Sequence, residues 1–202
     1  RIEGTPTEAG RFDAEIVYRD ANGCDVTVMR TIVVCNPIAV EATLPAATAG
    51  VAIAPTPFTV SGAVGATTLA VTAGALPAGL SFDGATGILS GTPTVVGTFP
   101  FTITATDSLG CTGSLATSLT VSCPTITVSP ASLANGTAGV AYGPVTLTQA
   151  GGVGTMTYAV TTGALPAGLT LTSAGVLSGA PTVTGTFSFT VTATDANSCT
   201  GT

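Results

Sequence analysis

The chain has 202 residues, a formal net charge of -6 and no lysine, histidine or tryptophan, and 7% of its residues are charged. Nucleic acids require a basic surface, which an acidic chain with four basic residues lacks, so we expect no nucleic-acid partner. Thr, Ser, Gly and Pro interrupt every apolar stretch before the length of about 18 residues that a membrane helix needs, so we expect no membrane span in this segment.

Residues 1–34 contain one clear strand pattern, in which apolar residues occupy every second position. The sequence IEGTPTEAGRFDAEIVYRDANGC at 2–24 aligns with LSGTPTVVGTFPFTITATDSLGC at 89–111, which lies late in the unit that follows. We therefore interpret residues 1–34 as the C-terminal part of a truncated module, and the chain as a window on a longer protein. The alternating apolar positions are Phe12, Ala14, Ile16 and Tyr18.

Residues 35–122 form one complete repeat unit, which is large enough to bury a small core. From position 99 onward, apolar residues alternate with threonines that are expected to point outward, as in a half-buried strand. Gly and Pro recur every few residues, so no long helix fits. Several short strands in fewer than 90 residues predict a sandwich of two sheets. The expected inward residues of this strand are Phe99, Phe101, Ile103 and Ala105.

Residues 123–202 repeat the same unit. The segment GALPAGL at 74–80 returns at 163–169, and FTITATDSLGCTG at 101–113 returns as FTVTATDANSCTG at 189–201. Such arrays of like modules usually build length or surface rather than one active site. We expect this unit to stop before its final strand. Its expected inward strand residues are Phe187, Phe189, Val191 and Ala193.

The run ALPAGLSFDGATGILSGTPTVVGTFPFTITATDSLGCTG and its copy ALPAGLTLTSAGVLSGAPTVTGTFSFTVTATDANSCTG carry a family resemblance. They resemble the immunoglobulin-like (cadherin-like) repeats of large bacterial surface adhesins, such as gliding-motility adhesins exported by the type IX secretion system. The resemblance implies an all-β fold of tandem immunoglobulin-like β-sandwich modules in an end-to-end array. It also implies an extracellular location at the bacterial cell surface. Residues 1–34, 35–122 and 123–202 then become a truncated, a complete and a last-strand-lacking immunoglobulin-like module.

One pairing of the five cysteines joins neighbours along the chain, Cys24 with Cys35 and Cys111 with Cys123. Residues 115–122 (LATSLTVS), however, read as a strand, which at about 3.3 Å per residue separates its flanking cysteines by more than about 20 Å. A disulfide requires Cα atoms about 4.4 to 6.8 Å apart. The neighbour pairing is therefore expected to fail.

In an immunoglobulin-like sandwich, the loop before the last strand lies at the same pole as the start of the first strand. We therefore predict disulfides between Cys35 and Cys111 and between Cys123 and Cys199, with Cys24 unpaired in this segment. The bridges have two possible roles: they carry tension along the chain, or they only stabilise a small secreted module. Both roles require an oxidising compartment.

Asp20, Asp107 and Asp195 occupy one repeat position, in the turn after the long strand, where cadherin-like domains often place calcium ligands. Calcium takes six to eight oxygens and usually several carboxylates. Each complete module offers one recurrent aspartate, so we prefer an aspartate that caps a turn through its own backbone. Calcium is kept as the alternative, and no other cofactor is expected.

Two short motifs suggest glycosylation. Asn135 begins an Asn-Gly-Thr sequon, and Ser108 lies in an Asp-Ser-Leu triplet that resembles the O-glycosylation signal of some gliding bacteria. Asn-Gly is also a common turn pair, and three residues match easily by chance. A turn at Asn135 is the interpretation that we prefer.

An enzyme is hard to build from these residues. Without histidine there is no imidazole base, and the cysteines have structural assignments, so an activated serine or cysteine nucleophile is not expected. Beyond Ala42 the acidic residues are sparse, so a carboxylate pair is not expected either. We therefore predict a non-catalytic chain. The acids beyond Ala42 are Asp83, Asp107 and Asp195.

Our preferred function is a structural stalk or spacer of a long extracellular adhesin or filament, clamped by disulfides to carry tension. Force that enters at Cys35 would cross to Cys111 and bypass residues 36–110, leaving 112–122 in the path before Cys123. The predicted partners are neighbouring repeats of the same long chain, and lateral self-association is left open. Almost no linker separates the modules, which favours a stiff rod with a repeat of roughly 35 to 45 Å.

The alternative is that the modules themselves bind carbohydrate or another surface ligand, in a cadherin-like and calcium-dependent manner in one variant. Carbohydrate sites favour exposed aromatic residues. The chain has no tryptophan, and most phenylalanines are predicted to point inward. Tyr142 and Tyr158 are the remaining candidates.

Overall fold

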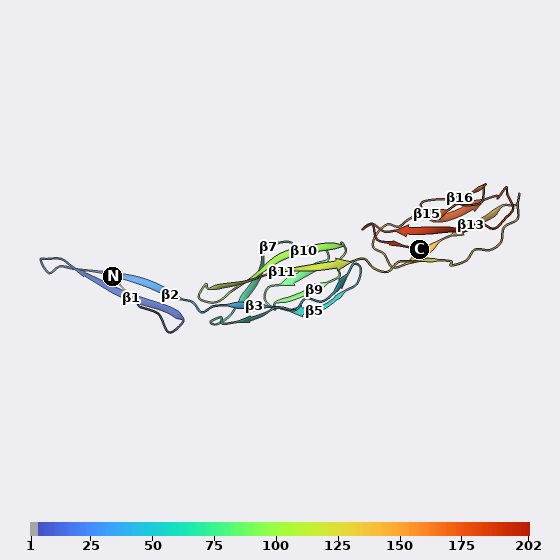
Figure 1. Ribbon diagram of the computed structural model, residues 1–202. Helices are drawn as coiled ribbons and strands as arrows, with labels where there is room; N and C mark the ends of the chain where they lie inside the picture. The colour runs from blue at the N-terminus through green and yellow to red at the C-terminus, as the bar shows by residue number, and fades with distance from the viewer. Residues whose placement is uncertain (1–3) are drawn as a thin grey trace.

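The computed structural model describes residues 4–202, and every regular element in that range is a β-strand. An opening hairpin, a middle module and a C-terminal module follow one another along one line (Figure 1). This arrangement confirms the predicted all-β array of tandem modules.

The opening hairpin joins β1 (Gly10–Arg19) to β2 (Asp25–Val34). The two strands are antiparallel, with Gly10 opposite Val34 and Arg19 opposite Asp25. The Arg19 guanidinium donates to both carboxylate oxygens of Asp25, at 2.6 and 2.7 Å. Within residues 4–202 no third strand pairs with this hairpin, so several of its large apolar side chains stay exposed. They are Phe12, Val17, Tyr18, Val26, Met29, Ile32 and Val33.

The middle module contains nine strands arranged in three sheets. The largest sheet has the order β4-β11-β10-β7, and the others have the orders β5-β9-β8 and β3-β6. The strands are β3 (Ala39–Glu41), β4 (Ala47–Thr48), β5 (Ile53–Pro57), β6 (Thr59–Ser61), β7 (Thr68–Gly74), β8 (Leu80–Asp83), β9 (Ile88–Gly91), β10 (Gly97–Thr106) and β11 (Thr112–Ser122).

Alternating residues of β10 and β11 supply much of the core of this module. Phe101, Ile103 and Ala105 of β10 are buried, as the period-two pattern predicts, and Leu119 and Val121 of β11 pack beside them. The intervening threonines of β10 face outward and pair across strands, as between Thr104 and Ser114. The core is therefore closed on one side by the last strand of the module. Other buried members of the cluster include Val40, Phe58, Leu69 and Leu89.

Close backbone approach explains a glycine at the start of β11. A Cβ added to Gly113 would collide with the carbonyl group of Ile38, and one added to Gly201 would collide with that of Ile126 in the C-terminal module. Only glycine lets the last strand begin this close to the segment that opens the module. The segment that opens each module and the start of its last strand therefore lie side by side at the same end of the module.

The C-terminal module repeats this plan with shorter strands. Its sheets have the orders β13-β17-β16, β15-β18-β19 and β12-β14. The strands are β12 (Thr127–Ser129), β13 (Tyr142–Thr146), β14 (Thr148–Ala150), β15 (Thr157–Gly163), β16 (Leu169–Leu171), β17 (Val176–Gly179), β18 (Phe189–Thr194) and β19 (Thr200–Gly201).

One predicted strand position is wrong. Phe187 was expected to point inward from a strand, but β18 begins at Phe189 and the Phe187 side chain is 39% exposed. In the middle module, the equivalent stretch of β10 pairs with the second half of β11. Its counterpart in the C-terminal module, β19, has two residues and pairs only with Ala193 and Thr194. Without a partner strand, the residues before Phe189 leave the sheet.

Candidate functional site

Two disulfides define the most distinctive sites of the molecule. They join Cys35 to Cys111 and Cys123 to Cys199, with Cα–Cα distances of 5.7 and 5.6 Å and a sequence separation of 76 residues in each. These are the two pairs predicted from the layout of an immunoglobulin-like sandwich, after strand length had excluded the pairing of neighbouring cysteines. Cys24 is an exposed free thiol in the opening hairpin.

Each bridge ties the start of a module to the loop before its closing strand. Cys35 precedes β3, and Cys111 directly precedes β11 (Thr112–Ser122), which leads without a break into Cys123. Cys111 and Cys199 are both buried, and Cys199 belongs to the core cluster of the C-terminal module. A covalent path therefore runs from one bridge to the next through β11 alone.

An aspartate turn positions the buried cysteine of each bridge. In the middle module, Oδ1 of Asp107 accepts hydrogen bonds from the backbone N–H groups of Leu109 and Cys111, both at 2.9 Å. Oδ2 accepts a third from Val64 at 3.0 Å. Burial acts to raise the pKa of Asp107, but the backbone donors of Val64, Cys111, Leu109 and Gly110 outweigh it and leave the pKa lowered. The ionised carboxylate thus fixes the loop that carries Cys111.

The same turn recurs at the other two repeat positions. Asp195 accepts hydrogen bonds from Val153 at 2.9 Å, Asn197 at 2.8 Å and Cys199 at 2.9 Å. Asp20 accepts two from its own turn, both at 2.8 Å. The sequence predicted the turn but missed the bond to the distant backbone at Val64 and Val153. A recurrent Gly-x-Val-Gly stretch at 62–65 and 151–154 was the available signal.

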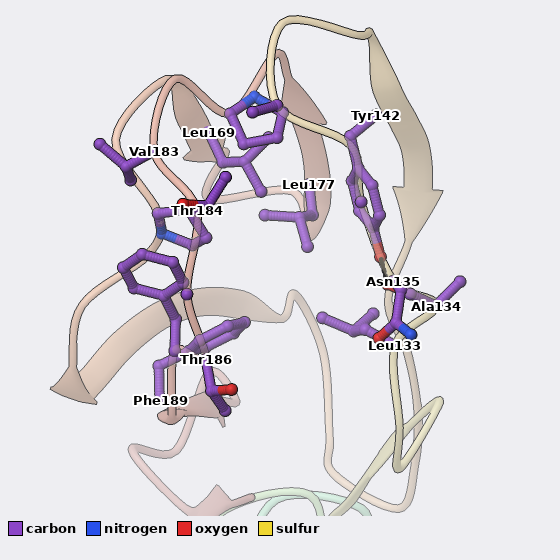
Figure 2. A pocket seen from close by; sticks show the side chains of 16 residues that line it. Leu133, Ala134, Asn135, Tyr142, Leu169, Leu177, Val183, Thr184, Thr186 and Phe189 are labelled. Atoms are coloured by element: carbon purple, nitrogen blue, oxygen red, sulfur yellow. Dashed lines mark hydrogen bonds between the residues drawn. The ribbon is translucent and has the colours of Figure 1, made fainter.

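A groove lies along the open edge of β18 in the C-terminal module. Two adjoining cavities of about 330 and 590 Å³ form it and share Leu133, Phe187 and Phe189 in their walls. Figure 2 shows part of its apolar lining, with Leu133 and Leu177 pointing into the space between the strands. We call this region the β18 groove, lined by Val128, Leu133, Leu147, Leu177, Phe187, Phe189 and Val191.

The middle and C-terminal modules touch directly. The Asn197 side-chain N–H donates to the Thr94 carbonyl group at 2.9 Å. Val96 packs against the cores of both modules, and Val153 packs against the core of the middle one. The junction therefore has specific contacts as well as a short connection.

A family model described as "Putative Ig domain" matches residues 36–122 and 124–202. The chain belongs to this family of immunoglobulin-like (Ig) domains. A search of curated proteins found no match. The two matched stretches contain Cys111, Cys199 and both buried aspartate turns, whereas Cys35 and Cys123 each lie one residue before a matched stretch.

Several solved structures of extracellular domains are similar to the Ig array. Drosophila N-cadherin EC1-4 is 13% identical, with 98% of this chain and 58% of that chain covered and a TM-score of 0.31. Mouse cadherin-23 EC22-24 is 13% identical, with coverage of 92% and 68% and a TM-score of 0.31. The protocadherin GammaB4 extracellular domain is 16% identical with a TM-score of 0.31. The match covers 91% of this chain but only 37% of that chain.

The carboxylates of the three calcium candidates accept hydrogen bonds from backbone N–H groups. In the part of the chain that the structure describes, no group of three or more His, Cys, Asp or Glu side chains is placed to hold a metal ion. Asp20, Asp107 and Asp195 are instead organised as turn caps. The chemistry available at these positions is therefore that of an anchored loop.

The remaining site candidates lie apart from one another. Ser108 is exposed and its hydroxyl donates to the Val64 carbonyl group at 2.7 Å, while Asn135 lies on an exposed segment beside the β18 groove. The Tyr142 hydroxyl donates to the Ala134 carbonyl group at 3.0 Å, as Figure 2 shows. Tyr158 is wrong as a ligand-binding candidate, because it is buried in the core and its hydroxyl contacts Gln149. Among residues 4–202 no helix is long and apolar enough to cross a membrane.

Proposed function

We propose that the chain is a stalk segment of a long extracellular adhesin or filament of a bacterial cell surface, and that it has no catalytic role. The observation that carries the proposal is the placement of both disulfides, each from the start of an Ig module to the loop before its closing strand. The proposed module boundaries are residues 1–34, 35–122 and 123–202.

Force applied along the array would pass through the bridges instead of the cores. Tension that reaches Cys35 crosses the sulfurs to Cys111 and runs along β11 to Cys123, where the second bridge begins. A strand is already nearly extended, at about 3.3 Å per residue, so it yields little further length. Residues 36–110 and 124–198 lie outside this path and would stay folded under load.

The setting of the proposed stalk follows from its chemistry. Disulfides persist in oxidising compartments, such as the surface of a cell. Each Ig module contains one disulfide, which fits an extracellular location. The bacterial surface, gliding motility and export by the type IX secretion system rest on the sequence resemblance. The proposed partners are neighbouring repeats, supported by the contact between Asn197 and Thr94.

Single-molecule pulling of the whole chain from its two ends tests this proposal. With the bridges intact, we expect no lengthening step from either Ig module, and only the opening hairpin should unzip. Reduction should add two steps, because residues 36–110 and 124–198 become stretchable. Each released segment spans about 250 to 270 Å when extended at about 3.3 to 3.6 Å per residue.

Replacing Cys24 with Ser provides the matched control, because it removes the free thiol and leaves both bridges in place. This variant should behave as the native chain does. Long steps under oxidising conditions would refute the tension path. The Ig array itself would survive that result.

A further inference from the structure

The connection between the two Ig modules is held at both ends. Ser122, at the end of β11, accepts a hydrogen bond from the Ala49 N–H group at 3.0 Å. On the other side, Ile126 is buried in the core of the C-terminal module. Residues 123–125 lie between these two anchors, so the joint can bend only where their backbone turns. The ring of Pro124 fixes one of the backbone angles in that stretch.

The Cys123–Cys199 bridge is attached to this short connection. Cys123 follows Ser122 directly, and its Cα atom lies 5.6 Å from that of Cys199. Cys199 is buried in the core cluster of the C-terminal module, at the end of the turn that Asp195 caps. We call residues 195–199 the junction turn. Because a disulfide keeps its two Cα atoms within a narrow range of distances, Cys123 and the junction turn can only move together.

The junction turn also reaches the middle module. Its Asn197 side chain donates to the Thr94 carbonyl group at 2.9 Å. Its Asp195 carboxylate accepts a hydrogen bond from the Val153 N–H group at 2.9 Å, and the Val153 side chain packs against the core of the middle module. A Cβ added to Gly50 would lie 3.1 Å from that side chain, so Val153 touches the end of the middle module. Both contacts therefore come from loops that one carboxylate holds together.

The middle module presents an ordered surface to the junction turn. The Thr94 N–H group and the Thr94 hydroxyl both donate to the Ala78 carbonyl group, at 2.9 and 3.2 Å. The neighbouring Pro93 carbonyl group accepts a hydrogen bond from the Gly50 N–H group at 2.8 Å. The Thr94 carbonyl group that accepts from Asn197 is therefore fixed by its own module.

We propose that the Cys123–Cys199 bridge clamps the joint between the two Ig modules and acts through the contact of Asn197 with Thr94. The bridge fastens the junction turn to the connection itself, and so sets the relative orientation of the modules. Without the bridge, both modules stay folded and the joint becomes a hinge at Cys123 and Pro124. This role does not depend on whether the array carries tension, because it concerns the orientation of the modules at rest.

The hydrogen bond across the joint needs such a tether. A single neutral hydrogen bond competes with water, so its net contribution is small. A covalent link of matching geometry keeps two partners at a high effective concentration, so a weak contact forms again each time it opens. Asn197 lies two residues from Cys199, and Cys123 lies one residue from the end of β11. The bridge therefore holds the donor beside its acceptor.

Pairs of serine substitutions in the two bridges test the proposal. The test variant carries Cys123→Ser and Cys199→Ser. The matched control carries Cys35→Ser and Cys111→Ser, which remove a bridge with the same sequence separation at the other end of β11. Each protein also carries Cys24→Ser, so that the free thiol of the hairpin is not labelled.

Spin labels on the two modules report their relative orientation. Ala85→Cys and Ala174→Cys place the labels on exposed turns of the middle and C-terminal modules. Pulsed dipolar spectroscopy should give one narrow distribution of label distances when both bridges are intact, and also in the control. The test variant should give a distribution at least about twofold wider, because a short unrestrained connection samples many angles. Circular dichroism should show unchanged strand content in both variants.

A second pair of variants decides the matter if the test variant fails to fold. Asn197→Leu introduces the residue that the middle module has at this repeat position, Leu109, so the turn can accommodate it. The control is Asn22→Leu, the same substitution at the equivalent position of the opening hairpin, where Asp20 accepts the Asn22 N–H group at 2.8 Å. With both bridges intact, Asn197→Leu should widen the distance distribution, and Asn22→Leu should leave it unchanged.

Three results would overturn the proposal. The first is a folded test variant whose label distances are as narrowly distributed as those of the chain with both bridges. The second is equal widening in the two serine pairs, which would mean that each bridge only stabilises its own module. The third is an Asn197→Leu distribution as narrow as that of Asn22→Leu.

Discussion

At the scale of single residues, Asp107 links the chemistry of a turn to the geometry of a disulfide. Its carboxylate holds the backbone of Cys111 and, from 43 residues away, that of Val64. The same set of bonds recurs at Asp195 with Cys199 and Val153. A carboxylate is suited to this role because ionised acceptors form stronger hydrogen bonds with backbone N–H groups than neutral ones do.

We expect Asp107→Asn to lower the melting temperature of the chain by several degrees. The amide offers one acceptor oxygen, so the N–H group of Val64 or those of the turn lose their partner. A loss the size of one hydrogen bond shifts a domain of 60 to 100 residues by about 4 to 8 °C. Calorimetry measures this, with Asp83→Asn in an exposed turn as the control that should change less.

Stability should also depend on the protonation of Asp107. Its pKa is lowered from the ordinary value of 3.8, so the folded state binds this proton less readily than the unfolded state does. The resulting stabilisation is fully present above the unfolded pKa of about 3.8 and is lost as the pH falls through the lower folded pKa. Urea unfolding from about pH 2 to pH 7 should show this decline. A decline of the same size in Asp107→Asn would show that other carboxylates cause it.

Some of these residues could be predicted from the sequence and others could not. The cysteines and the aspartate turn were predictable because they recur in register with the repeat and the strand length limits the pairing. The bond from Val64 was not, because it joins residues 43 apart whose approach depends on the finished fold. Tyr158 was misassigned because a tyrosine fits either face of a strand, and only packing decides that its ring is buried.

At the scale of elements, the length of a strand depends on its partner. The alternating pattern predicted β10 and β18 as equals, yet β10 has 10 residues and β18 has 6. Their local sequences are nearly the same. The difference comes from β11 and β19, because a strand edge without a partner leaves its backbone groups to water. A local pattern therefore predicts that a strand exists but not how far it extends.

We expect Leu119→Ala to destabilise the middle module by about 2 to 5 kcal/mol, the usual cost of deleting a buried leucine. Leu119 lies opposite Phe99 of β10, and Val121 of the same strand β11 belongs to the same core cluster. Urea denaturation should show one module unfolding earlier while the other is unchanged. Ser118→Ala on the exposed face of the same strand is the control. An equal loss in both variants would mean that strand propensity, and not core packing, sets the stability.

At the scale of the whole molecule, the junctions decide whether the array is a rod or a flexible chain. Cys123 follows the last strand of the middle module directly, and Val96 touches both cores. The Asn197 side chain adds a hydrogen bond to Thr94 across the junction. These contacts cross from one Ig module to the next, so bending would have to break them. The sequence predicted the short linker, whereas the contacts follow from the positions of loops that only the fold brings together.

A Gly-Ser insert of about six residues between Ser122 and Cys123 should turn the rod into a flexible pair of modules. Small-angle scattering of the native chain should give an elongated particle whose modules repeat every 35 to 45 Å or so, as strand lengths imply. The insert lengthens the connection and removes the contacts of Asn197 and Val96, so the scattering should change to that of an ensemble with varied angles. The same insert between Ala85 and Thr86, in an exposed turn of the middle module, should leave the elongated profile unchanged. A Gly-Ser segment cannot by itself hold two modules in line. If the junction insert also leaves the profile unchanged, the contacts between the modules form without the short connection, and the prediction is wrong.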